Sequence, residues 1–331
     1  MPVLLAAAAL AGCAGTSAGA AQAGGAPAGL FAGWRTDVHR HVVPLSEFQS
    51  GGPGKDGIPA VDRPRFAPAR ATRYLQPREP LIELTVHGQT RGYPLEILIW
   101  HEIVNDRIAG VPVAVTFCPL CNTAIAFDRR LGGTVLDFGT TGNLRNSDLV
   151  MYDRQSESWW QQFSGQALVG RFAGRTLGLL PARIVSWRDF LTRHPNALVL
   201  TRHTGYARPY GENPYQGYDD VSSPPFFPVR NGGDRRLPPK QRVVYIEAGR
   251  ESVAVSEALL ARKKVVRVRI GGHQFVVRAT GTAATALGAA TIADARGVVT
   301  ARVTENGRPV PFTEPFWFAV AAFRPHTRVI R

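Results

Sequence analysis

The hydrophobic pattern predicts short strands separated by tight turns in the first half of the chain. Residues 81–86 alternate between apolar and polar side chains, as a half-buried strand does, and a turn follows at 87–89. Pro94 suits the first turn of a helix, and the apolar residues after it recur at helical spacing. We therefore predict a strand, a turn and then a helix over residues 95–105.

Two β-branched, apolar runs follow this helix. Residues 111–117 and 124–127 predict a pair of strands around a tight turn, and residues 134–138 predict a third strand. Near the end of the chain, the run 316–323 predicts a buried element that is either a strand or a helix.

A weaker copy of this pattern recurs later in the chain. A shift of 161 residues aligns Gly88 with Gly249 and Val104 with Val265 (249 − 88 = 265 − 104 = 161). Strand, turn, helix and strand then follow in the same order in both stretches. We therefore predict a β-rich α+β fold, largely antiparallel, with an internal duplication of a strand-turn-helix-strand unit. The expected organisation is one globular domain over residues 37–331, with two pseudo-repeated lobes at about 78–200 and 238–331.

Charge adds little to this prediction. The formal net charge is +14, but only four of the 39 basic residues are lysines, and the arginines are scattered with no basic tail or block. A nucleic-acid-binding surface concentrates its positive charge, so we do not expect a nucleic-acid partner.

The N-terminus has the features of a lipoprotein signal. A short apolar run from Val3 to Leu10 precedes Cys13 in the sequence Leu-Ala-Gly-Cys, which is typical of a lipobox. Cleavage before Cys13 makes residues 1–12 a signal peptide, and residues 13–36 a lipidated cysteine with a flexible tether. We therefore expect an extracytoplasmic protein that is held on the bacterial cell membrane by its lipid anchor.

Lipidation of Cys13 leaves two free thiols, Cys118 and Cys121, in the sequence Cys-Pro-Leu-Cys between two predicted strands. A cysteine pair in a tight turn between strands is typical of a metal-binding knuckle, whereas a thioredoxin-type pair opens a helix. Zinc and copper both suit thiolate ligands. His101 is the nearest additional ligand in sequence, and His326 is a fourth candidate. A redox-active thiol pair is the other possibility for an active site, and a structural disulfide in a non-catalytic binding or scaffold module is the alternative.

The densest group of polar and aromatic residues lies between positions 139 and 170. Arginine, carboxylate and tryptophan side chains together can line a pocket for a polar ligand, but they can equally be the bonded turns and core of two hairpins. The candidate ligand-binding residues are Asn143, Arg145, Asn146, Asp148, Asp153, Arg154 and Trp160.

Several longer motifs together resemble a known family. They are Trp100-His101-Glu102-Ile103-Val104-Asn105-Asp106, the Cys-Pro-Leu-Cys turn, Arg145-Asn146-Ser147-Asp148-Leu149, Met151-Tyr152-Asp153-Arg154 and Phe316-Trp317-Phe318-Ala319. This combination resembles the bacterial and archaeal domain-of-unknown-function family 3179, over roughly residues 37–331. The resemblance implies one continuous domain in an extracytoplasmic setting, and it implies no reaction. It also implies glycine after the second cysteine, where this chain has Asn122, a residue that tolerates left-handed backbone.

Overall fold

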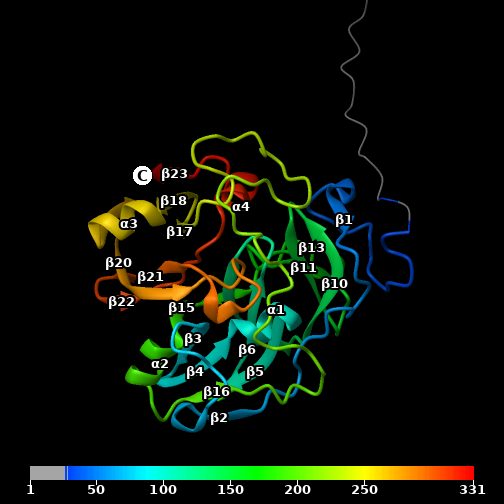
Figure 1. The fold of residues 1–331 in the computed structure, drawn as a ribbon. Helices are drawn as coiled ribbons and strands as arrows, with labels where there is room; N and C mark the ends of the chain where they lie inside the picture. Colours follow the sequence, from blue (N-terminus) through cyan, green and yellow to red (C-terminus); the bar gives the residue numbers. More distant parts are fainter. Residues whose placement is uncertain (1–26, 28) are drawn as a thin grey trace, which may run out of the picture.

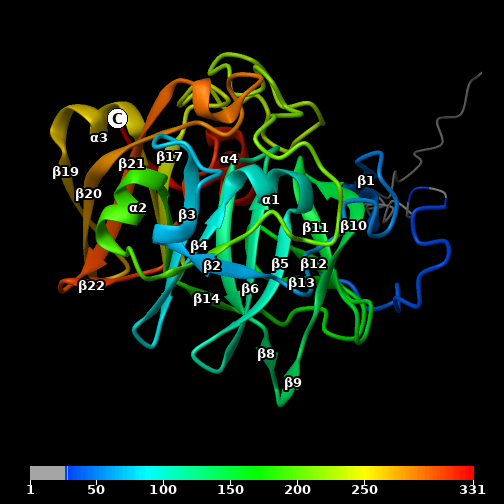
Figure 2. The same ribbon diagram turned by 60° about the horizontal axis from the view of Figure 1, so that its bottom comes forward.

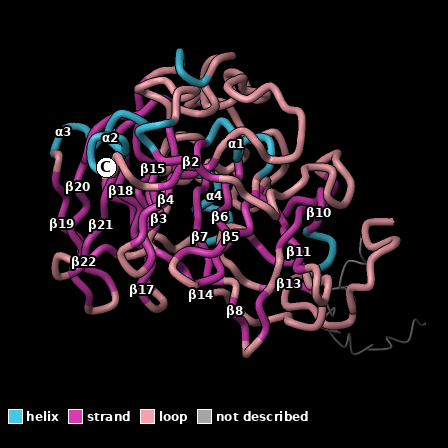
Figure 3. Tube along the Cα trace, turned by 90° about the horizontal axis from the view of Figure 1, so that it is seen from below, coloured by secondary structure: helices cyan, strands magenta, loops and turns pink. Residues whose placement is uncertain are grey.

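The computed structural model describes residue 27 and residues 29–331. Figure 3 shows that strands make up most of its regular structure, as the hydrophobic pattern predicts. The described residues contain four α-helices, which are α1 (Leu95–His101), α2 (Trp187–Arg193), α3 (Glu257–Lys263) and α4 (Trp317–Phe323), and three 3₁₀-helices, which are η1 (Leu45–Glu47), η2 (Ala69–Ala71) and η3 (Ile292–Asp294). None of these helices is long and apolar enough to cross a membrane.

The first three sheets are formed by residues 48–200. One sheet contains β1 (Phe48–Ser50), β10 (Phe138–Arg145), β11 (Asp148–Asp153), β12 (Trp159–Gln161) and β13 (Ala167–Val169). The second has the order β14 (Gly178–Leu180), β7 (Thr123–Asp128), β6 (Val111–Cys118) and β5 (Ile103–Ile108). The third has the order β15 (Ala182–Ser186), β3 (Pro80–Val86), β4 (Gln89–Pro94), β16 (Leu198–Leu200) and β2 (Phe66–Pro68).

Two further sheets come from the C-terminal part of the chain. One has the order β17 (Val243–Ala248), β18 (Glu251–Ser256) and β23 (Arg328–Ile330), and the other has the order β19 (Val265–Ile270), β20 (His273–Ala284), β21 (Gly297–Glu305) and β22 (Arg308–Pro309). A small hairpin of β8 (Arg130–Leu131) and β9 (Thr134–Val135) projects from the body (Figure 2). The five larger sheets follow one another around the molecule in a propeller-like arrangement (Figure 1).

The sheets are mostly antiparallel, as predicted. Among the named strands, only β16 with β4 and β18 with β23 pair in parallel. The predicted strands at 81–86, 111–117 and 124–127 are confirmed as β3, β6 and β7. The run 316–323, for which the sequence left strand or helix open, forms the buried helix α4.

Helix α1 begins where the sequence predicts but ends sooner. Pro94 is its N-cap residue, and the helix ends at His101 because Glu102 adopts a φ of 58°. Residues 103–108 then pair with β6, starting from Ile103 opposite Thr116. The predicted helix end at residue 105 was therefore wrong, because residues 103–105 pair with β6 as the first part of strand β5.

One shared hydrophobic core joins the N-terminal and C-terminal parts of the chain. Its buried members run in sequence from Ala60 to Ala321 and include α1, β6, β7 and α4. The packed region begins before the expected boundary at residue 37, because the ring of Phe31 stacks on Trp159 with centroids 4.2 Å apart and Thr36 is buried. Cys13 and the expected signal peptide lie outside the described residues.

Two stretches of the chain have the same order of elements at a constant spacing. Helices α1 and α3 begin at positions 95 and 257, and strands β6 and β20 begin at positions 111 and 273, so both pairs have the same offset (257 − 95 = 273 − 111 = 162). The sheet order β14-β7-β6-β5 corresponds to β22-β21-β20-β19. The shift seen in the sequence (249 − 88 = 161) falls one position short of this offset.

Candidate functional site

The two cysteines lie at the tip of the β6–β7 hairpin. Cys118 pairs with Thr123 across the hairpin, and Asn122 in the turn has a φ of 57°, a left-handed conformation that asparagine tolerates. The turn is also anchored from distant parts of the chain. The amide of Phe316 donates to the Cys121 carbonyl at 2.9 Å, and the Tyr218 hydroxyl donates to the Leu120 carbonyl at 2.9 Å.

The carboxylate of Asp148 lies close to the two cysteine sulfurs at this turn. The ligand atoms of Cys118, Cys121 and Asp148 all lie within 4.8 Å of one another, and all three residues are buried. The Cys121 thiol donates a hydrogen bond to Asp148 Oδ1 at 2.8 Å. Both cysteines are free thiols in the structure. We call these three residues the Cys-Asp cluster.

A second hairpin turn positions Asp148. Asp148 pairs with Arg145 across β10 and β11, and the turn residues Asn146 and Ser147 have φ values of 54° and 57°. The other carboxylate oxygen, Oδ2, accepts hydrogen bonds from Gln161 Nε2 at 2.5 Å and from the Phe163 amide at 2.9 Å. These contacts hold the carboxylate with Oδ1 directed at the sulfur of Cys121.

A chain of buried polar side chains supports the sulfur of Cys121. This sulfur lies 2.9 Å from Thr123 Oγ1, which donates to Gln162 Oε1 at 2.6 Å. Gln162 Nε2 in turn donates to Thr116 Oγ1 at 2.8 Å. The Cys-Asp cluster is therefore fixed in position by hydrogen-bond partners outside it.

Burial controls the electrostatics of the site. It raises the pKa of Cys118 and raises that of Cys121 well above the ordinary thiol value, and the charge of Asp148 adds to both shifts. Burial also raises the pKa of Asp148 to about 6. The pKa of Glu102 rises to about 8 through burial and through the charge of Asp148. The site without a cation thus favours neutral thiols, and a bound cation would reverse that preference.

The two histidine candidates lie elsewhere. His101 is buried, and its ring nitrogens contact the Pro59 carbonyl and the Tyr210 hydroxyl, each at 2.7 Å. His326 is exposed in the segment after α4. The structure brings Asp148 to the two cysteines in place of a histidine. The sequence marked Asp148 as a ligand-binding residue, but nothing in the local pattern linked it to the cysteine turn.

The other polar candidates are engaged in separate contacts. Arg145 pairs with Glu47 at 2.5 Å, Arg154 pairs with Asp62 at 2.8 Å, and Asp153 accepts a bond from the indole nitrogen of Trp160 at 2.9 Å. Asn143 bonds to Thr141, and the Asn146 side-chain carbonyl accepts from the Arg230 amide at 3.0 Å. Apart from Asp148, these residues tie turns and strands together.

Comparison with known proteins gives one match. The family model described as a protein of unknown function, DUF3179, matches residues 55–327 of the 331-residue chain. This range contains the Cys-Asp cluster and both stretches with the repeated element order. No curated protein and no solved structure matches the chain.

Proposed function

We propose that this chain, which belongs to the DUF3179 family, binds a thiophilic transition metal ion, zinc or copper, through the Cys-Asp cluster. The observation that carries the proposal is the convergence of two thiols and one carboxylate on a single buried point. Sulfur and carboxylate ligands on two different hairpins are typical of a metal site rather than of a thiol pair acting alone.

The spacing of the ligand atoms suits such an ion. Zinc lies about 2.3 Å from a thiolate sulfur and about 2.0–2.2 Å from a carboxylate oxygen, so tetrahedral coordination places ligand atoms roughly 3.5–3.8 Å apart. All three ligand atoms here lie within 4.8 Å of one another. Small side-chain shifts would bring Cys118, Cys121 and Asp148 onto one ion.

The three ligands leave a fourth position, and Glu102 is a further buried carboxyl group whose charge contributes to the raised pKa of Cys118. Three protein ligands with an open position are typical of catalytic or transfer sites, whereas structural zinc sites have four. We therefore propose that water or another small ligand exchanges at the metal.

A redox-active thiol pair receives less support. Redox exchange needs an accessible thiolate with a lowered pKa, but both sulfurs here are buried and burial raises both pKa values. The same burial suits a metal ion, which displaces the thiol protons on binding. A structural disulfide in a binding or scaffold module remains the competing outcome of the test below.

The test is elemental analysis of protein purified anaerobically without an affinity metal, combined with a count of free thiols. We expect about one zinc or copper ion per chain. Cys118→Ser and Asp148→Asn should lose the metal, whereas His101→Gln should retain it. Cobalt substitution should give thiolate-to-metal absorption in the wild type that weakens in Cys118→Ser.

Two results would overturn the metal assignment. One is unchanged metal content in Cys118→Ser, and the other is a Cys118–Cys121 disulfide in metal-free protein that retains full stability. Asp153→Asn is the matched control for Asp148→Asn, because both aspartates are fully buried and hydrogen-bonded but only Asp148 belongs to the cluster.

We further propose that this site faces the exterior of a bacterial cell, with Cys13 as the lipid anchor. The lipobox sequence supports this, and the packed region starts near residue 30, which leaves the intervening residues as a spacer between membrane and domain. A single acyl chain gives only weak membrane binding, so the full anchor requires several acyl chains.

We also propose that the two stretches with the same element order arose by internal duplication. The constant offset between their elements and the matching sheet orders support it. Position 118 corresponds to Thr280 in the second stretch, so the cysteine chemistry would be a specialisation of one copy. Superposition of β3–β6 on β17–β20 tests this, and a poor fit of the two helices would contradict it.

A further inference from the structure

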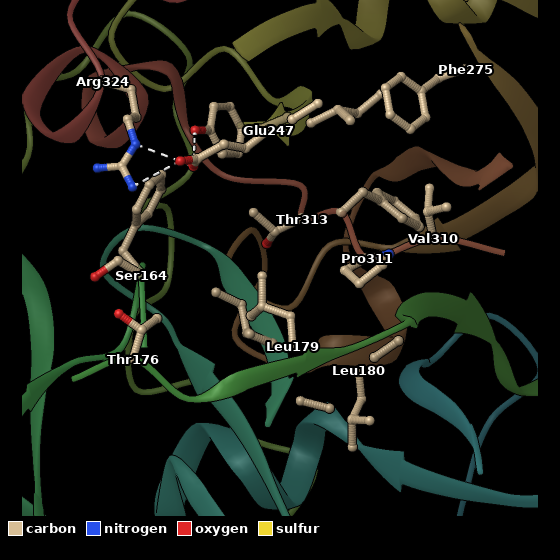
Figure 4. Close-up of a pocket in the computed structure, with 18 of the residues that line it drawn as sticks. Ser164, Thr176, Leu179, Leu180, Glu247, Phe275, Val310, Pro311, Thr313 and Arg324 are labelled. Carbon is tan, nitrogen blue, oxygen red and sulfur yellow. Dashed lines mark hydrogen bonds and ion pairs between the residues drawn. The ribbon is translucent and has the colours of Figure 1, made fainter. Parts of the chain in front are cut away.

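Two cavities of nearly equal volume lie between the two halves of the fold. The first cavity, of about 620 Å³, lies between β17 on one side and β7 with β14 on the other (Figure 4). The second cavity, of about 610 Å³, lies between β3 with β15 on one side and β21 with β22 on the other. Both volumes are in the range of small-molecule sites. Neither cavity includes a residue of the Cys-Asp cluster.

Equivalent positions line the two cavities. Glu83 in the second cavity corresponds to Tyr245 in the first, because their numbers differ by the same offset as the repeated elements (245 − 83 = 162). Their strand partners are Arg183 and Thr313 respectively. The two cavities therefore lie at corresponding places in the two stretches with the same element order, and the differences in their lining residues show what each one favours.

The same correspondence applies to the opposite walls. Ile125 in the first cavity pairs with Thr116, whereas Arg302 in the second pairs with Arg278, the position equivalent to Thr116 (278 − 116 = 162). The position that the apolar Ile125 fills in the first cavity is therefore filled by the cationic Arg302 in the second.

The two cavities also differ in the charges of the side chains that line them. In the first cavity, Arg324 and Glu247 neutralise each other through two contacts of 3.1 Å (Figure 4). The second cavity is lined by three arginines, Arg183, Arg193 and Arg302, and by one carboxylate, Glu83. Counting these four side chains, the second cavity has an excess of two positive charges.

Glu83 holds two of the arginines in place. Its Oε1 accepts hydrogen bonds from Arg183 Nε at 2.9 Å and from Nη2 at 2.8 Å, and its Oε2 lies 2.6 Å from Arg193 Nη1. Within residues 29–331, Arg302 has neither an ion pair nor a side-chain hydrogen bond, and its charge acts on Arg183. Glu83 thus orients Arg183 and Arg193, and its single negative charge neutralises only one of the three positive charges.

We propose that the second cavity is a binding site for a small organic dianion, with Arg302 and Arg193 as the groups that contact its charged end. Guanidinium groups bind phosphate and carboxylate oxygens in a bidentate manner, and two unneutralised positive charges match a dianion. The remaining walls include the apolar side chains of Val303, Val310 and Phe312, so the ligand has an apolar body beside its anionic group.

The test is isothermal titration of the full chain with 1-naphthyl phosphate at low salt, with phthalate as a dicarboxylate and 1-naphthol as the neutral analogue. We expect saturable binding of the two dianions and none of 1-naphthol. Binding of one dianion alone would identify phosphate or carboxylate as the preferred group. Arg302→Gln should weaken dianion binding about ten-fold or more, because it removes one guanidinium contact.

The matched control is Arg267→Gln, which removes an exposed arginine from β19, outside both cavities. It should leave the affinity within about two-fold of the wild type. Equal weakening by Arg302→Gln and Arg267→Gln, or binding of 1-naphthol as tight as that of 1-naphthyl phosphate, would overturn the proposal.

Discussion

Replacing Asp148 with asparagine tests the metal proposal most directly, because the substitution keeps the side-chain volume and removes the ligand. Asp148 accepts three hydrogen bonds, from Cys121, Gln161 and Phe163. Asparagine keeps one acceptor oxygen, so the metal-free variant should lose only about 1–2 kcal/mol of folding stability. Its fold should therefore survive while its metal binding fails.

The size of the metal effect follows from linkage. At a free metal concentration 100 times the dissociation constant, binding stabilises the wild type by about 2.7 kcal/mol. For a chain with about 300 ordered residues, that raises the melting temperature by roughly 4 °C. If loss of one of three ligands weakens binding about 100-fold, the same metal concentration stabilises the variant by only about 0.4 kcal/mol, which is less than about 1 °C.

The assay is a thermal melt of each protein with chelator and with added zinc or cuprous ion under anaerobic conditions. Asp153→Asn is the control and should keep the full metal-dependent rise. A rise in Asp148→Asn equal to that of the wild type would refute the role of Asp148 as a ligand, and the absence of any rise in the wild type would refute the metal site itself.

Three further predictions concern other parts of the molecule. Burial, together with a smaller contribution from nearby Glu96, raises the pKa of Glu79 to about 7, so its ionisation destabilises the fold as pH rises from about 5 to 7. Glu79→Gln should therefore stabilise the protein by up to about 3 kcal/mol at pH 8 and hardly at all at pH 4.5 in urea unfolding, and an equal gain at both pH values would contradict this. Gly142→Ala should cost about 3 kcal/mol or more in the same assay, because its φ is 74° and a Cβ there would overlap the Pro53 carbonyl oxygen, whereas Gly132→Ala, whose Cβ meets nothing within 4 Å, should cost about 1 kcal/mol. Cys13→Ser should move the protein from the membrane to the soluble fraction of fractionated cells, and unchanged membrane association would exclude the lipid anchor.

Local signals in the sequence were sufficient for the individual elements near the site. The β-branched runs on both sides of Cys118-Pro119-Leu120-Cys121 predicted the β6–β7 hairpin, and Pro94 marked the start of α1. The repeated pattern also pointed to the second stretch, although the shift was one position short. These features depend on contacts between residues close in sequence, so hydrophobic periodicity and turn chemistry are enough to predict them.

The partners of each candidate side chain depended on packing between distant segments. His101 lies close to the cysteine turn in sequence but bonds to Pro59 and Tyr210, which are 42 and 109 residues away. Asp148 lies 27 residues from Cys121 in sequence, and the two residues meet because the turn of the β10–β11 hairpin packs against the turn of the β6–β7 hairpin. The charge contrast between the two cavities likewise appears only when β21 faces β3. The sequence by itself therefore determined the β6–β7 hairpin, the start of α1 and the thiol pair. The tertiary structure decided which carboxylate joins the two thiols and which arginines line the second cavity, because sheet docking, not chain proximity, sets which side chains meet.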